Sequence, residues 1–169
     1  MLRNELMPKD VFVSHSDADA AVATALTDCI IAGTGLHHRD VLCTSHPNPD
    51  AQLKPGEDIN RTLRKHLDDC RILVPIVSRE SIKRNYVLFE IGGAWALEKR
   101  IMPVVVEKDL RAAMPEIIRG LIYTEFDSPA RIHALILAIS RECFVAADQP
   151  SSVTVDSAVQ DYIAKIKNA

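Results

Sequence analysis

Short apolar runs alternate with longer segments of helical periodicity along most of this chain, and this alternation limits the possible folds more than any other feature. Strand-length apolar runs are found at Val11–Ser14, Val41–Ser45, Arg71–Val77, Ile101–Val106 and Ile122–Phe126. Runs of this length without polar alternation are typical of strands that are buried on both faces of a sheet. The third run contains Pro75, which removes one backbone donor from the strand ladder.

The segments between these runs have apolar residues at helical spacing. From Ala21 to Ile30 the apolar positions recur every helical turn, which predicts a helix, and we expect Gly33 and Gly35 to end it. Ser16, with Asp19 three residues later, resembles a capping box at the start of this helix. Further helices are predicted over Ile59–Leu67, Arg84–Lys99 and Ile132–Ile139.

Five strands that alternate with helices predict an α/β fold. The expected architecture is a flavodoxin-like, doubly wound, five-stranded parallel sheet of order 2-1-3-4-5, with helices on both faces. The chain has 169 residues, 47% of them hydrophobic, which suits one well-buried domain. We expect this domain to span residues 1–144, and a linker with a C-terminal amphipathic helix to occupy residues 145–169. The sequence leaves open whether this helix packs on the domain or on a partner.

Charge and composition argue against several classes of partner. There are 20 Lys and Arg residues and 23 Asp and Glu residues, so the net charge of −3 argues against nucleic acid bound by a general basic field. No apolar run approaches the roughly 20 residues that span a bilayer, and the first residues lack the apolar core of a secretory signal. The four cysteines, Cys29, Cys43, Cys70 and Cys143, have no zinc-ligand spacing. We therefore expect a cytoplasmic, reduced protein with no metal and no membrane partner.

In a sheet of this order, ligands bind beyond the carboxyl ends of the strands, between strands one and three. Ser14–Ser16 follow the first strand, and Ser78 and Arg79 follow the third. The Pro-rich loop His46–Glu57 is expected to form a wall of the same crevice. The sequence has no P-loop motif, and no G-x-G-x-x-G follows the first strand. It also lacks a receiver-type phosphoacceptor, because strand three ends in Val77-Ser78 without an acidic residue.

Three blocks of sequence point to one family. They are FVSHSDAD at residues 12–19, LKPGEDI at residues 53–59 and NYVLFEIGGAWALEKRIMPVVV at residues 85–106. Together and in this order they resemble the Toll/interleukin-1 receptor (TIR) domain in its bacterial form. The resemblance extends from Lys9 to Phe144. It implies the α/β fold expected above and self-association through contacts between TIR domains.

The resemblance also implies an enzyme. Many TIR domains of this type cleave NAD+ between nicotinamide and ribose, releasing linear or cyclic ADP-ribose, and in bacteria they act in immune and antiphage signalling. Their catalytic glutamate follows an aromatic residue by four positions in the helix after strand three, where Glu90 and Tyr86 stand here. By alignment, His15, Ser16 and Lys54 are expected to contact the substrate. NAD+ is then the substrate, no cofactor is needed, and a sensor domain or partner protein is expected to activate the chain.

The residue types suit this chemistry. Nicotinamide leaves as a neutral group while the ribose develops oxocarbenium-like positive charge, which one carboxylate can stabilise. Tyr86 and Glu90 are four residues apart and share a helix face, and Gly93 lies close to that face. The aromatic ring can stack on nicotinamide, and Lys54 can meet a phosphate.

Simpler interpretations stay open for each residue. Without the family resemblance, Glu90 would be an ordinary solvated carboxylate on a helix. His15 would be a structural histidine at a strand end, Tyr86 a core residue and Lys54 a solvated loop lysine. Trp95 is expected in the core because its helix face is apolar. The alternative for the whole chain is a non-catalytic module that assembles through TIR–TIR contacts.

Overall fold

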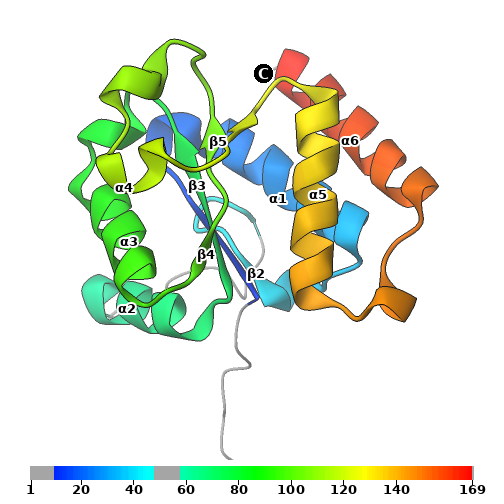
Figure 1. The fold of residues 1–169 in the computed structure, drawn as a ribbon, viewed down its shortest axis with the longest axis horizontal. Coiled ribbons are helices and arrows are strands. Elements are labelled where there is room, and N and C mark those ends of the chain that lie inside the picture. The colour runs from blue at the N-terminus through cyan, green and yellow to red at the C-terminus, as the bar shows by residue number, and fades with distance from the viewer. Residues whose placement is uncertain (1–9, 48–57, 169) are drawn as a thin grey trace, which may run out of the picture.

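The computed structural model describes residues 10–47 and 58–168, and a parallel β-sheet lies at its centre (Figure 1). The strands are β1 (Val11–Ser14), β2 (Val41–Leu42), β3 (Ile72–Val77), β4 (Arg100–Ile101), β5 (Val104–Val105) and β6 (Thr124–Glu125). They run in the order β2-β1-β3-β5-β6, with β4 also paired to β3, and every pairing is parallel. The predicted α/β fold and its strand order are confirmed, with six strands among the described residues in place of five.

Two prolines divide the expected fourth strand into β4 and β5. The register of β3 is the same with β4 as with β5, which places Pro75 opposite Pro103. Neither proline has a backbone N–H, so the ladder loses donors on both strands at this point. The prediction of one strand over Ile101–Val106 was therefore wrong. The second and fifth predicted strands are also shorter than expected, because β2 ends at Leu42 and β6 has two residues.

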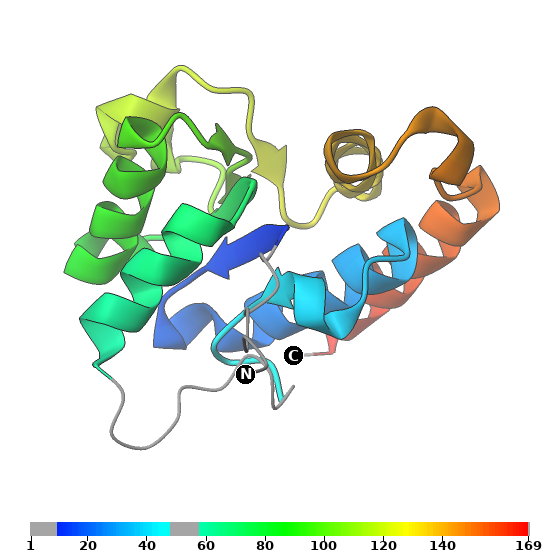
Figure 2. The ribbon, with the colours of Figure 1, turned by 90° about the horizontal axis from the view of Figure 1, so that it is seen from below.

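Helices cover both faces of the sheet, as predicted. They are α1 (Ala20–Thr34), α2 (Ile59–Asp69), α3 (Asn85–Ala96), α4 (Glu116–Arg119), α5 (Pro129–Cys143) and α6 (Ser152–Lys167). Shorter 3-10 turns are η1 (Asp17–Asp19), η2 (His38–Asp40), η4 (Ser81–Lys83), η5 (Leu110–Ala113) and η6 (Ala146–Asp148). Figure 2 shows α2, α3 and α4 on one side of the sheet and α1, α5 and α6 on the other.

Side chains of the central strand alternate between two cores. Ile72, Val74 and Ile76 of β3 enter the core beneath α1, α5 and α6. Leu73 and Val77 enter the core beneath α2, α3 and α4. Burial on both faces explains why this strand is a continuous apolar run and has no alternation of polar and apolar residues.

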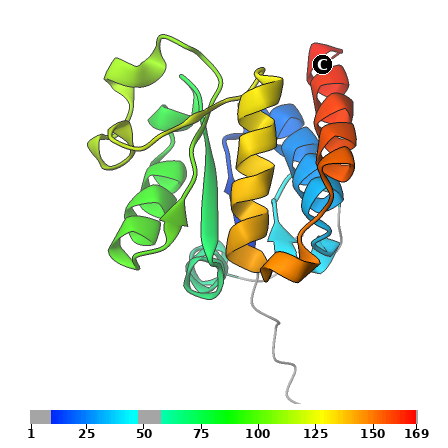
Figure 3. The ribbon, with the colours of Figure 1, turned by 45° about the vertical axis from the view of Figure 1, so that its right-hand side comes forward.

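The C-terminal helix α6 packs on the domain, which decides the question that the sequence leaves open. It runs along α1 and also contacts α5 (Figure 3). The residues that it buries there are Val155, Ala158, Val159 and Tyr162. Near its end, Lys165 Nζ donates a hydrogen bond to Asp28 Oδ2 in α1 at 2.7 Å. The helix is thus attached by apolar contacts and by an ion pair.

Gly35, and not Gly33, ends α1. Gly35 has a φ of 78°, and its N–H donates to the carbonyl of Ile31 at 3.0 Å. Gly33 lies inside the helix, where a Cβ atom would lie 2.7 Å from Cγ2 of Ile136 in α5 and 3.4 Å from Cβ of Ala158 in α6. The prediction that Gly33 helps to end the helix was wrong, because this glycine instead lets α1 approach two neighbouring helices closely.

Trp95 is also placed differently from the prediction, since it is 62% exposed. The buried residues of α3 are Val87, Glu90, Ile91 and Ala94. Apolar residues occur all round this helix, so their spacing does not identify the face that turns toward the sheet.

Alanine at position 33 tests the close packing of α1. Gly33→Ala gains helix propensity but forces Ile136 or α6 to shift, so the free energy of unfolding should fall by about 1 kcal/mol. Gly92→Ala is the matched control, because Gly92 lies inside α3 and, in the described part of the chain, no atom beyond its own helix backbone and chain neighbours lies within 4 Å of a Cβ position. The control should gain up to about 1 kcal/mol. Urea unfolding measures both, and equal gains in the two variants would contradict the close approach at Gly33.

Candidate active site

Glu90 lies in the middle of α3 and contacts the end of β1. The residue is only 7% exposed. Ser14, the last residue of β1, donates a hydrogen bond from its Oγ to Oε2 of Glu90. The contact joins α3 to the carboxyl end of β1, where a ligand site is expected in this fold. Its burial excludes the alternative in which Glu90 is a solvated carboxylate on the helix surface.

The surroundings of Glu90 change its protonation. Burial raises the pKa of Glu90 from the usual 4.5 to about 7, while the hydrogen bond from Ser14 acts in the opposite direction by favouring the ionised carboxylate. The group therefore titrates near neutral pH. Perturbed carboxyl groups of this kind cluster at functional sites.

A cavity of about 620 Å³ lies between α2 and α3, with Glu90 in its wall. Its lining consists of Arg64, Leu67, Asp68, Asn85, Tyr86, Phe89, Glu90, Gly93, Ala96 and Leu97. Tyr86 and Glu90 share this cavity, in agreement with their four-residue spacing on one helix face. Tyr86 is 53% exposed, which excludes its interpretation as a core residue. At Gly93 a Cβ atom would lie 3.3 Å from Leu67 Cδ1, so the glycine leaves room on this face.

His15 lies beyond the end of β1, outside the lining of this cavity. Its Nε2 is hydrogen-bonded to Ser45 Oγ at 2.7 Å, and its Nδ1 is 3.3 Å from the carbonyl oxygen of Val13. The ring thereby connects β1 to the segment after β2. Burial lowers the pKa of His15, so its neutral form dominates at pH 7. These contacts supply the structural role that the sequence leaves open, and contact with a substrate stays a prediction.

Ser16 takes part in a buried hydrogen-bond network that joins the ends of β1 and β3. Its hydroxyl donates to Asp19 Oδ2 at 2.5 Å, and Ser78 Oγ donates to the same oxygen at 2.7 Å. Ser81 Oγ in turn accepts from the N–H of Ser78 at 2.8 Å. The predicted capping box does not form, because the Ser16 hydroxyl binds the Asp19 carboxylate and no backbone N–H. The predicted contact of Ser16 with substrate stays a prediction.

Two parts of the predicted site fall outside the described residues. One is Lys54, and the other is most of the loop His46–Glu57, of which only His46 and Pro47 are described. His46 Nε2 lies 2.9 Å from Asp28 Oδ1, so the described beginning of this loop is attached to α1.

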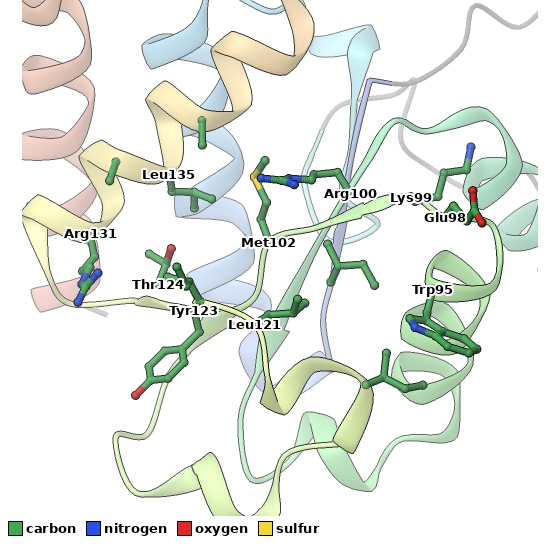
Figure 4. Close-up of a pocket in the computed structure, with 15 residues that line it drawn as sticks. Trp95, Glu98, Lys99, Arg100, Met102, Leu121, Tyr123, Thr124, Arg131 and Leu135 are labelled. Carbon is green, nitrogen blue, oxygen red and sulfur yellow. The ribbon is translucent and has the colours of Figure 1, made fainter.

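A second cavity, of about 700 Å³, lies beside the C-terminal end of α3 (Figure 4). Figure 4 shows Trp95 on α3 at one side, Leu135 and Arg131 on α5 at the other, and Met102 between them. Lys99 and Arg100 also line it. None of His15, Ser16, Tyr86 and Glu90 does. This cavity is therefore separate from the candidate site.

Within residues 10–47 and 58–168, no group of three or more His, Cys, Asp or Glu side chains is placed to hold a metal ion. No helix in those ranges is both long and apolar enough to cross a bilayer. The cysteines are free thiols, and burial raises the pKa of Cys29 to about 12 and the pKa of Cys70 to about 11, which makes both poor nucleophiles.

Comparison with known proteins decides the family. The sequence model of the TIR domain matches residues 11–136, well over half of the chain. The chain belongs to the TIR domain family. The match spans the whole sheet and includes α3 with Glu90, whereas α6 of this TIR domain lies beyond the matched residues.

Individual relatives have low sequence identity to this chain. The uncharacterized protein YddK of Bacillus subtilis (strain 168) is 31% identical over 94 residues, which make up 55% of this chain and 34% of that protein. The matched part of the TIR chain thus spans about a third of that relative. Among solved structures, the TIR domains of the activated Roq1 resistosome, which directly recognizes the pathogen effector XopQ, match with 18% identity. That match has a TM-score of 0.49 and covers 92% of this chain and 84% of the other.

Ser14 was predicted to lie at the ligand crevice, but its contact with Glu90 was not predicted, and Asp19 was predicted only as part of a capping box. A signal for Ser14 is present, because Phe12 packs beneath α3 and residues two apart on a strand point to the same face. Ser14 is therefore aimed at α3 by its position alone. No sequence pattern predicts the place of Asp19 in the site. Its partners are the hydroxyl groups of Ser16, after β1, and Ser78, after β3, which meet only in the folded protein.

Glu90 should make the stability of this TIR domain depend on pH. Its pKa is higher in the folded protein than the 4.5 of an unfolded chain, so the carboxyl stabilises the fold at low pH and loses that contribution as pH rises through about 7. Relative to Glu90→Gln, the wild-type free energy of unfolding should fall by about 2–3 kcal/mol from pH 5 to pH 8. Urea unfolding of both proteins measures this difference. Parallel pH profiles would show that Glu90 does not titrate in this range.

Proposed function

We propose that this TIR domain is an NAD+ glycohydrolase with Glu90 as its catalytic residue. The observation that carries the proposal is the buried carboxyl group of Glu90 in the wall of a 620 Å³ cavity, beside the exposed ring of Tyr86. Ligand sites have volumes of about 300–1,000 Å³, so the cavity is large enough for a substrate. The resemblance of the sequence around Glu90 to NAD+-cleaving TIR domains supports NAD+ as that substrate.

In the proposed reaction, the bond between ribose C1′ and the nicotinamide nitrogen breaks, and nicotinamide leaves as a neutral molecule with the bonding electron pair. The ionised carboxylate of Glu90 stabilises the oxocarbenium-like charge on the ribose. A water molecule adds to C1′ and releases a proton to solvent, which gives ADP-ribose. Attack by the adenine ring of the same molecule gives a cyclic product instead.

Other residues of the proposed site bind the substrate. Tyr86 stacks on the nicotinamide ring, and Lys54 meets a phosphate group. His15 and Ser16 approach the substrate from the end of β1. Because the pKa of His15 is lowered by burial, its neutral ring adds no positive charge beside the cationic nicotinamide. The proposed reaction uses no metal or cofactor.

The proposed activity belongs to bacterial immune or antiphage signalling in the cytoplasm. A sensor domain or partner protein would activate it. This role rests on the resemblance to bacterial NAD+-cleaving TIR domains.

Replacing the carboxylate tests the assignment. Glu90→Gln should lower kcat/KM for nicotinamide release by about 10²-fold or more, because the charge on the ribose loses its electrostatic partner. In the wild type, kcat/KM should rise as pH passes through about 7, because only the ionised carboxylate stabilises the cation. Chromatography of nicotinamide over a range of protein concentrations measures both effects.

The matched control for this experiment is Glu116→Gln. The Glu116 side chain is exposed on α4, so this variant loses a carboxylate outside the site and should keep full activity. Full activity of Glu90→Gln would overturn the assignment of the catalytic residue.

A second function, a non-catalytic module that assembles through TIR–TIR contacts, is favoured by a different observation. Large apolar side chains are exposed around the 700 Å³ cavity, namely Trp95, Ile117, Leu121 and Ile122. Gathered apolar side chains of this kind mark protein–protein contacts. We propose that the domain self-associates at this surface, which serves either function.

Trp95→Gln tests the association surface. Buried tryptophan dominates many interfaces, so this variant should raise the Kd of self-association by about 10-fold or more. Val153→Gln is the control, because Val153 is an apolar residue on α6 that is even more exposed than Trp95 and lies outside the lining of the cavity. Sedimentation velocity measures the association of both variants. Equal association of the wild type and Trp95→Gln would contradict this surface.

A further inference from the structure

We propose that Ser14 is a positioning residue of the candidate site, whose hydroxyl holds the Glu90 carboxylate ionised and in place at the end of β1. The inference rests on the proposed function for its catalytic meaning, while the contact itself is a feature of the structure. Ser14 Oγ donates to Glu90 Oε2 across 76 residues of sequence. Among the described residues, Ser14 is the only hydrogen-bond partner of the Glu90 side chain.

The backbone of Ser14 is fixed by the sheet. It is the last residue of β1 and pairs with Pro75 of β3, and it is buried. A donor on a strand is held more precisely than a donor on a loop, and a precise donor is what a catalytic group requires. The hydroxyl therefore reaches Glu90 from a rigid strand. The position of this donor is set by the sheet and not by α3, the helix that carries Glu90.

Charged side chains near Glu90 do not replace Ser14 in stabilising its carboxylate. Arg64 and Asp68 of α2 line the same cavity, but the pKa of Glu90 is shifted upward by burial and downward by the hydrogen bond from Ser14. On the side of β1, His15 is hydrogen-bonded to Ser45 and Asp19 accepts from Ser16 and Ser78. The Ser14 hydroxyl is therefore the group that opposes the desolvation of the Glu90 carboxylate.

The direction of the hydrogen bond determines its effect. A hydroxyl that donates to a carboxylate stabilises the charged form, and a hydrogen bond to a charged group is stronger than one between neutral groups. Without it, the buried carboxyl group keeps its proton to higher pH. The proposed reaction needs the ionised form, so loss of Ser14 should weaken catalysis most at low and neutral pH.

The direct test is a titration of the Glu90 side chain in the full chain, followed by NMR of ¹³C-labelled glutamate. The signal is assigned by its loss in Glu90→Gln. Ser14→Ala should raise the pKa of Glu90 by about 1 unit or more, since hydrogen bonds to charged groups are worth that much. Ser14→Thr keeps the hydroxyl and should restore most of the wild-type value.

Ser140→Ala is the matched control, because Ser140 is a buried serine on α5 whose Oγ has no hydrogen-bond partner within residues 10–47 and 58–168. It should leave the pKa of Glu90 unchanged. An unchanged pKa in Ser14→Ala would overturn the inference, whether or not the protein cleaves NAD+.

Enzyme kinetics then test whether Ser14 acts on catalysis through Glu90. The rise of kcat/KM with pH should move to higher pH in Ser14→Ala, and activity should recover toward the wild-type level at pH 9. In a Glu90→Gln background, Ser14→Ala should cost less than about 2-fold, because the two residues act as one unit. An equal loss at every pH would show a merely structural role and overturn the inference. A raised pKa in a protein that never releases nicotinamide would overturn the proposed function instead.

Discussion

Strand β3 pairs with β1 on one side and with β4 and β5 on the other, and all six of its residues are buried. Because both of its faces must be covered, helices are required on each side of the sheet. One of these coverings is α3, which follows β3 in the chain. Its packing brings Glu90 against the end of β1. The pairing of β1 with β3 brings Ser78, which follows β3, to Asp19, which lies beyond β1. The candidate site thus follows from the need to bury the central strand.

Two opposing effects act on the carboxyl group of Glu90. Burial of a carboxyl group favours its neutral form, whereas a hydroxyl donor favours the charged form. The balance leaves the pKa of Glu90 near 7, so that both forms are populated at neutral pH. A group of this kind destabilises the fold as it ionises, and this cost is typical of residues retained for function.

The two faces of the domain differ in how completely they are covered. On one face, α6 lies along α1 and α5, and Gly33 allows a close approach there. On the other face, α3 leaves Phe89 and Trp95 exposed to solvent. The 620 Å³ cavity opens on this second face, between α2 and α3. This second face therefore carries both the cavity of the candidate site and the exposed apolar side chains of α3.

The sequence by itself determined the order of strands and helices, the parallel sheet, and the positions of Glu90 and Tyr86 four residues apart on one helix. These features depend on local periodicity and on short motifs, which a single chain displays directly. It did not determine the division of β4 from β5, because two prolines distant in sequence meet only when the sheet forms. Nor did it determine that Glu90 is buried and Trp95 exposed, since α3 is apolar all round and only packing selects its inner face. The contact of Ser14 with Glu90 was likewise decided by tertiary structure, because the two residues are 76 positions apart and meet only when α3 packs against the end of β1.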